Sequence, residues 1–315
     1  MCIALLTKAL CLTATLISFV SGEIRDCSRW EKIGITVAGT AGKNGSSSTE
    51  LAWPSHVIVD NENNLYVSDR KNNRIQKFSP GSKTGITIVN STYIYQPAGL
   101  SFDQKENILY IVDLKGLQKW TKEDGVVLVH EGHGVLRDVF IDKTGTIYVS
   151  DSGSGTVLKL FPETVVAGIA NEKGSAASQL NKCDGLFVDY DGNVLVADSA
   201  NNRIQKWKPL ASSGITVAGK LKNGSDDLSL DNPLGMISDE NDNVYVSDQR
   251  NHRIQLWKKN ATTGITIAGG NKDGIAMNQL KYPHGLAFDS VGNLYVADRY
   301  NHRIQKFAID NSQCS

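Results

Sequence analysis

The sequence predicts an all-β fold, a six-bladed β-propeller with four-stranded antiparallel blades, closed by the N-terminal strand completing the last blade. Three observations predict it. A sequence repeat recurs at nearly constant length, and each repeat contains four strand-like runs. The first repeat also lacks its opening segments, whereas the last repeat lacks its closing segment. An aspartate that closes a run such as Tyr-Val-Ser-Asp marks each repeat. The six copies, 38 to 50 residues apart, are Asp69, Asp113, Asp151, Asp198, Asp248 and Asp298.

Each repeat contains four short runs rich in β-branched and aromatic residues, separated by Gly, Asn and Asp. This composition is typical of strands joined by hairpins, and turn sequences such as Asp-Gly-Asn at 191–193 follow the first run. Apolar residues show no helical period that would compete with this interpretation. In the fifth repeat the runs are 234–239, 243–248, 253–257 and 264–268.

The ends of the repeat series predict how the ring closes. The phrase Gly-Ile-Thr-Val-Ala-Gly first occurs at 34–39 with no repeat before it, whereas the last Arg-Ile-Gln phrase, 303–305, has no such segment after it. We therefore expect strand 35–38 to pair with strand 303–307 as the outermost strand of the sixth blade. Cys27 and Cys314 leave the same edge of that blade, which predicts a disulfide between them.

The first 22 residues differ from the rest of the chain. Lys8 precedes an apolar run of twelve residues, 9–20, which ends in small residues and is shorter than the ~20 needed to span a bilayer. This pattern predicts a secretory signal at 1–22 and one propeller domain at 23–315. No second hydrophobic run or anchor signal follows, so we expect a secreted, extracellular monomer.

Of the three remaining cysteines, Cys183 is expected to be a free, partly buried thiol rather than a nucleophile.

The surface is expected to be glycosylated and electrically neutral. The 33 basic residues balance the 33 acidic ones, and neither a basic stripe nor a net positive charge supports nucleic-acid binding. Asn-x-Ser/Thr motifs in loop-like stretches predict glycosylation at Asn44, Asn90, Asn223 and Asn260.

The repeat resembles the NHL repeat family. The resemblance is carried by Asp-x-x-Asn-x-Arg-Ile-Gln-Lys-Phe/Trp, preceded by runs such as Gly-Asn-Leu-Tyr-Val-Ala-Asp at 292–298, and it covers residues 31–310. Members of that family form six-bladed propellers, so the resemblance implies the same fold as the repeat count. Blades two and three depart from the pattern, because Gly116 and Thr156 stand where the arginine is expected. We expect these blades to form the irregular sector of the ring.

Most recurrent residues are interpreted as framework. A charge-assisted bond between the repeat aspartate and the arginine five residues later would hold the hairpin, and a role shared by four blades is seldom a unique site. The aspartates recur around the ring instead of converging, which favours turns over calcium. Blade packing is the expected role of the aromatic residues at one strand position: Phe78, Trp120, Trp207, Trp257 and Phe307.

Departures from the repeat point to the mouth of the central channel. The positions just inside the start of each innermost strand vary in chemistry, while their surroundings repeat. Arg137, Asp138 and Asp184 fall in adjacent blades, as do His56 and His284. If a small ligand or ion binds, the expected contacts are His56, Arg137, Asp184 and His284; a solvated funnel with a structural Arg–Asp pair is the alternative.

These observations favour an extracellular binding or scaffold module for a protein or small ligand on the loop face, without a catalytic set, nucleic acid or cofactor. The alternative is an enzyme. The family resemblance includes the peptidyl-hydroxyglycine amidating lyase, which holds zinc with histidines at the channel. Zinc catalysis needs about three protein ligands, so His56 and His284 would require His130 or His133 as a third. A calcium-dependent, lactonase-like hydrolase would need a converging Glu/Asn/Asp set, which the six strand starts do not show.

Overall fold

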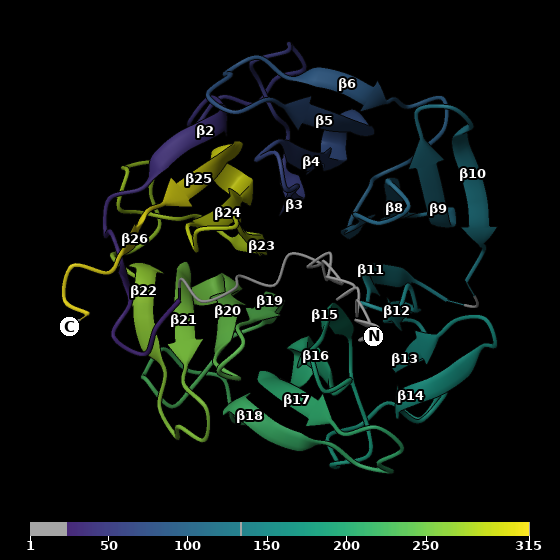
Figure 1. Ribbon diagram of the computed structural model, residues 1–315. Coiled ribbons are helices and arrows are strands. Elements are labelled where there is room, and N and C mark those ends of the chain that lie inside the picture. Colours follow the sequence, from purple (N-terminus) through teal and green to yellow (C-terminus); the bar gives the residue numbers. More distant parts are fainter. Residues whose placement is uncertain (1–23, 133, 315) are drawn as a thin grey trace, which may run out of the picture.

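A computed structural model describes residues 24–132 and 134–314 of the chain. The predicted signal segment, residues 1–22, lies outside the described residues. The described chain forms six four-stranded antiparallel sheets, arranged as blades around a central axis, so the predicted β-propeller is confirmed (Figure 1). No helix among the described residues has the length and apolar character needed to cross a membrane.

The blades follow one another along the chain, and the first strand of each lies beside the first strands of its neighbours around the axis (Figure 1). Blade 1 contains β3 (Pro54–Val59), β4 (Leu65–Asp69), β5 (Arg74–Phe78) and β6 (Ile86–Val89); blade 2 contains β7 (Leu100–Asp103), β8 (Ile108–Asp113), β9 (Gly116–Thr121) and β10 (Gly125–His130). Blade 3 contains β11 (Leu136–Ile141), β12 (Ile147–Asp151), β13 (Thr156–Lys159) and β14 (Thr164–Gly168).

The remaining blades continue the ring, and the last takes its outer strand from the N-terminal part of the chain. Blade 4 contains β15 (Cys183–Val188), β16 (Val194–Asp198), β17 (Arg203–Trp207) and β18 (Ile215–Gly219); blade 5 contains β19 (Pro233–Ser238), β20 (Val244–Asp248), β21 (Arg253–Trp257) and β22 (Ile265–Gly269). Blade 6 contains β23 (Pro283–Phe288), β24 (Leu294–Asp298), β25 (Arg303–Phe307) and β2 (Ile35–Gly39).

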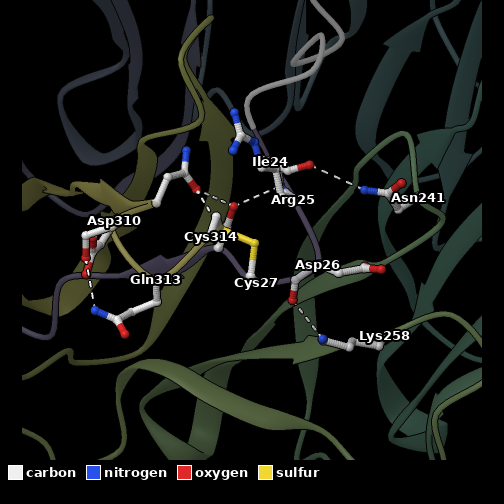
Figure 2. The surroundings of a disulfide bond; sticks show 12 residues. Ile24, Arg25, Asp26, Cys27, Asn241, Lys258, Asp310, Gln313 and Cys314 are labelled. Atoms are coloured by element: carbon white, nitrogen blue, oxygen red, sulfur yellow. Dashed lines mark hydrogen bonds between the residues drawn. A yellow bond between two sulfur atoms is a disulfide. The ribbon is translucent and has the colours of Figure 1, made fainter.

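Ring closure follows the prediction and adds one element to it. Strand β2 pairs antiparallel with β25, with Gly39 opposite Arg303, and Cys27 and Cys314 form a disulfide (Figure 2). A second pairing, which the repeat pattern does not predict, joins β1 (Arg29–Trp30) to β26 (Ile309–Asp310). The indole of Trp30 is buried there and donates a hydrogen bond to the carbonyl of Gly292 at 2.9 Å. Closure therefore combines a strand pair, a buried aromatic residue and a covalent bond.

The repeated arginines hold each regular blade to the loop that enters it. In blade 6, Nε of Arg303 lies 2.7 Å from the buried carboxylate of Asp298, and the same guanidinium donates to the carbonyls of Ile275, Ala276 and Gln279. Equivalent arginine–aspartate pairs occur in blades 1, 4 and 5 at the same 2.7 Å distance. The framework interpretation of these residues is thus confirmed, because their donors are used within the fold.

A short 3-10 turn separates the second and third strands in the four regular blades. The turns are η1 (Arg70–Asn72), η2 (Ser199–Asn201), η3 (Gln249–Asn251) and η4 (Arg299–Asn301). In blades 2 and 3, residues 114–115 and 152–155 make the same connection without such a turn. The buried Asp113 carboxylate accepts from Gln118 Nε2 instead of an arginine. These blades form the irregular sector, as expected.

The glycine of the Gly-Ile-Thr phrase lies on the aromatic ring that ends the third strand. A Cβ added at Gly214 would lie 2.8 Å from Cδ2 of Trp207, and one at Gly85 would lie 2.7 Å from Cζ of Phe78. A side chain at either position would displace the ring, which explains why the glycine recurs. Phe78, Trp207, Trp257 and Phe307 are almost fully buried, whereas Trp120 of irregular blade 2 is only partly so.

Candidate functional site

A cavity of about 230 Å³ opens at the channel mouth, on the face that carries the crossover loops and the 3-10 turns. All six blades contribute to its wall. The four residues that sequence analysis placed at the mouth, His56, Arg137, Asp184 and His284, line this one cavity. Strands β3, β11, β15 and β23 therefore bring together side chains that lie up to 228 positions apart in the sequence.

Four charged residues of the wall were not among the predicted contacts: Arg70, Asp138, Lys182 and Arg299. Arg70 and Arg299 begin η1 and η4, directly after the repeat aspartates. The same position carries Ser199 and Gln249 in blades 4 and 5. This variation immediately after an invariant aspartate is the signal that would have identified the two arginines. Neither arginine lies at the start of an innermost strand; each reaches the cavity from the first position of a 3-10 turn.

Lys182 belongs to a rim of residues that precede the innermost strands in left-handed conformation. Trp53, Gln96, Lys182, Asn232 and Tyr282 have φ between 52° and 60°. Side chains of the preceding blade hold four of these residues in place. For example, Nδ1 of His302 accepts from the Trp53 amide and Nδ1 of His252 from the Tyr282 amide, at 3.3 and 3.1 Å. These hydrogen bonds give His252 and His302 a structural role, and they fix the backbone of the rim at the mouth.

One carboxylate at the mouth interacts with two cations. Asp184 lies 3.6 Å from Nε of Arg137 and 3.5 Å from Nζ of Lys182, through its two different oxygens. Nζ of Lys182 also donates to Oδ1 of Asn232 at 3.3 Å. The Arg–Asp pair considered in the sequence thus exists, but it is loose and shared. Asp184 balances at most one of the two positive charges beside it.

His56 and Asp138 narrow the channel below the mouth. Nε2 of His56 lies 3.8 Å from Oδ1 of Asp138, whose carboxylate also accepts from the Leu186 and Val139 amides at 3.0 Å each. Burial lowers the pKa of His56 to about 4. Burial, with a smaller contribution from Asp184, raises the pKa of Asp138 to about 7 against those two amide bonds. At mildly acidic pH the pair therefore carries its proton on the aspartate.

Beneath this constriction the channel becomes apolar. A second cavity of about 160 Å³ is also lined by His56 and Asp138, and so continues from the first. Its other lining residues come from the lower halves of the innermost strands and include Ile58, Phe102, Phe140, Phe187, Ile237 and Phe288. The axis thus joins a charged mouth to an apolar chamber.

Several buried polar atoms around the mouth have no hydrogen-bond partner among the described residues. They are Nδ1 of His56, Nε of Arg137, Oδ2 of Asp184 and Nε of Arg299. Buried polar groups are normally paired, and an unpaired one costs roughly 1–3 kcal/mol. Four such atoms at one cavity mark it as a place where a bound molecule would gain hydrogen bonds that the protein does not make by itself.

The residues considered for zinc do not all meet at the mouth. His130 lies on β10, the outermost strand of blade 2, and its Nε2 is 3.6 Å from a carboxylate oxygen of Glu163. Within the described part of the chain, which excludes His133, no three His, Cys, Asp or Glu side chains gather as a metal-binding group.

The other predicted sites lie away from the channel. Asn44, Asn90, Asn223 and Asn260 are all exposed in loops. Cys183 is free, as predicted, but it is fully buried rather than partly buried. Its thiol donates to the carbonyls of Asp151 and Thr156 at 3.1 and 3.3 Å. Burial raises its pKa, which keeps the thiol protonated and unreactive.

Comparison with known proteins supports the repeat and the fold. The NHL repeat pattern matches residues 51–78 and 280–307, in blades 1 and 6. No curated protein matches the sequence closely enough to count as a relative. The chain resembles an auxiliary nutrient binding protein from Bacteroides thetaiotaomicron, with a TM-score of 0.72 and 13% identity over 89% of this chain and 77% of that one.

Two further solved structures share the architecture. A protein of unknown function from Bacteroides thetaiotaomicron has a TM-score of 0.71 and 18% identity, covering 90% of this chain and 76% of that one. A streptogramin B lyase has a TM-score of 0.57 and 13% identity, covering 90% of this chain and 97% of the lyase. At these identities the likeness concerns the fold alone.

Proposed function

We propose that this NHL-repeat β-propeller is a secreted, monomeric binding module that takes a small ligand at its channel mouth, with His56, Arg137, Asp184 and His284 among the contacts. The carrying observation is that four ionisable residues with an unpaired buried polar atom, His56, Arg137, Asp184 and Arg299, line one cavity at positions where the repeat varies. The repeat arginines are paired within the fold, as Arg303 is with Asp298, whereas Nε of Arg137 and Nε of Arg299 at the mouth have no hydrogen-bond acceptor among the described residues. The nutrient-binding description of one structural neighbour supports a binding role.

The disulfide supports secretion, because such bonds form and persist in oxidising compartments. The four exposed acceptor asparagines are accessible to glycosylation in the same compartment. Expression in a secreting eukaryotic cell should yield protein in the medium that begins near residue 23 and loses mass on treatment with an N-glycosidase. Light scattering should give the mass of one chain. Retention of residues 1–22 in the product would contradict the signal assignment.

The binding role is tested by native mass spectrometry of the secreted protein, followed by a thermal-shift screen of charged and neutral metabolites. A ligand found in this way should bind the His56→Ala/His284→Ala double variant at least about tenfold more weakly. The melting temperature of that variant should stay close to that of the wild type. Lys105→Ala, at an exposed hairpin residue away from the cavity, is the control and should bind normally. Equal affinity in the double variant would remove the mouth as the site.

A further inference from the structure

Arg70 and Arg299 occupy equivalent positions in adjacent blades, and neither has an acidic partner within 4 Å in the described structure. Each directly follows the repeat aspartate of its blade, and in both blades that aspartate is already bound to another arginine, Arg74 or Arg303. The carboxylates nearest along the chain are therefore occupied. Two guanidinium groups reach the same cavity with their positive charges unbalanced.

Neutral groups hold both guanidiniums in place. Arg70 donates to Oε1 of Gln96 at 3.1 Å. The guanidinium carbon of Arg299 lies 5.9 Å from the ring centroids of both Trp53 and Tyr300, and its Nε is buried without a hydrogen-bond acceptor. Contacts of this kind orient a cation while leaving its charge available to a ligand. This positioning is what a preorganised anion site requires.

The surrounding charges reinforce the positive field. Arg137 and Lys182 share the single carboxylate of Asp184. Burial, Arg299 and Arg137 together lower the pKa of Arg70 to about 10, and burial with these arginines and His56 holds the pKa of His284 well below its usual range. The histidines therefore add no positive charge at neutral pH, and the arginines repel one another across the cavity. A bound anion would remove this repulsion.

We infer that the channel mouth binds a small anion through Arg70 and Arg299, with Arg137 completing the site. The ligand class is a compact molecule bearing a carboxylate, sulfate or phosphate group, whose paired oxygens match the fork of donors on a guanidinium. The cavity volume of about 230 Å³ lies just below the roughly 300–1,000 Å³ of typical small-molecule pockets, which suits a small metabolite rather than a polymer. This inference rests on the proposed function and names its ligand.

The test uses isothermal titration of the secreted protein with sodium sulfate and with sodium malonate, in low-salt buffer at matched ionic strength. Wild-type protein should bind at least one of the two anions saturably. Arg70→Gln/Arg299→Gln should bind it at least about tenfold more weakly. Glutamine is chosen because Gln249 stands at the same repeat position in blade 5, so the turn accommodates it. Arg70→Lys/Arg299→Lys, which keeps the charge but not the fork, should retain part of the affinity.

Arg250→Gln is the matched control, because it removes a positive charge from a 3-10 turn on the same face but outside the cavity. It should bind like the wild type. Absence of saturable binding, or equal affinity in the wild type and the Arg70→Gln/Arg299→Gln variant, would overturn the anion site. If a neutral or cationic ligand instead depends on His56 and His284 but not on the two arginines, the binding role stands and the anion inference alone fails. A ligand insensitive to all four substitutions would overturn both.

Discussion

His56 and Asp138 meet across an intervening blade: their side chains approach to 3.8 Å, yet they stand on the innermost strands of blades 1 and 3. The contact is possible because blade 2 presents Gly99 between them. A Cβ at that position would lie 2.2 Å from Oδ1 of Asp138. Four blades carry glycine at this strand position, and His56 and Asp138 replace it in blades 1 and 3. The two replacements are therefore coupled, and together they divide the channel into a charged mouth and an apolar chamber.

Stability should respond to pH in opposite directions in two variants of this pair. His56, whose pKa is lowered to about 4, contributes stability that is lost as pH falls from about 6.5 to about 4. Asp138, whose pKa is raised to about 7, contributes stability that is lost as pH rises from about 4 to about 7. Between pH 4.5 and 6.5 the two slopes, each up to about 1.4 kcal/mol per pH unit, largely cancel in the wild type. Relative to it, Asp138→Asn should gain unfolding free energy with rising pH and His56→Gln should lose it. Urea unfolding at about three pH values measures this; parallel curves would contradict the coupling.

Gly99→Ala should destabilise the protein by about 1–3 kcal/mol or more, because both the Asp138 carboxylate and its Cα, 2.6 Å from the new methyl group, would have to move. Gly81→Ala is the control. It lies in an open hairpin with nothing within 4 Å of the added Cβ, so only its φ of 74° opposes the substitution. Chemical denaturation should show the larger loss at Gly99. A smaller loss there would mean that the inner strands can separate at little cost.

Arg303→Met should lower the unfolding free energy by about 3–5 kcal/mol, since it leaves the buried Asp298 carboxylate without its cation and frees three loop carbonyls. Arg74→Met should cost less. The side chain of Arg74 is 12% exposed, compared with 1% for Arg303, so water replaces part of the lost interaction. Equal losses at the two positions, measured by denaturant unfolding, would argue against burial as the cause.

Cys314→Ser should destabilise the ring by about 2–4 kcal/mol, less than the roughly 5 kcal/mol upper bound that loop entropy allows for so long a loop. The β1–β26 pair and the buried Trp30 keep the termini together without the disulfide. Hydrogen exchange should show β2 opening before the other strands. Peptide mapping under non-reducing conditions checks the bond itself, and recovery of Cys27 linked to Cys183 would contradict it.

Sulfate affinity should rise as pH falls from 8 to 6, because Asp138 takes up a proton near pH 7 and removes a negative charge from the cavity wall. Sulfate does not titrate in this range, so the dependence reports on the protein. The Asp138→Asn variant should show little pH dependence over the same interval. A wild-type affinity that is constant from pH 8 to 6 would separate Asp138 from the anion site.

The local sequence by itself determined the architecture. A strand alternates its side chains between two faces, and turns require glycine, asparagine or aspartate, so each blade is recognisable within about fifty residues. Ring closure also followed, because an unpaired strand at each end of the repeat series has only the other as its complement. The disulfide followed as well, because Cys27 lies a few residues before the first strand of the pair and Cys314 a few residues after the second. The β1–β26 pair was missed because two-residue strands carry no periodic pattern.

The candidate site depended on tertiary structure. Strand starts were visible in the sequence, which is why His56, Arg137, Asp184 and His284 could be placed at the mouth. Whether they share a cavity, and that Arg70 and Arg299 join them, depends on how 3-10 turns in separate blades bend toward the axis. The His56–Asp138 contact depends on a glycine in a third blade. Propeller geometry brings together residues hundreds of positions apart, and no local pattern encodes those distances.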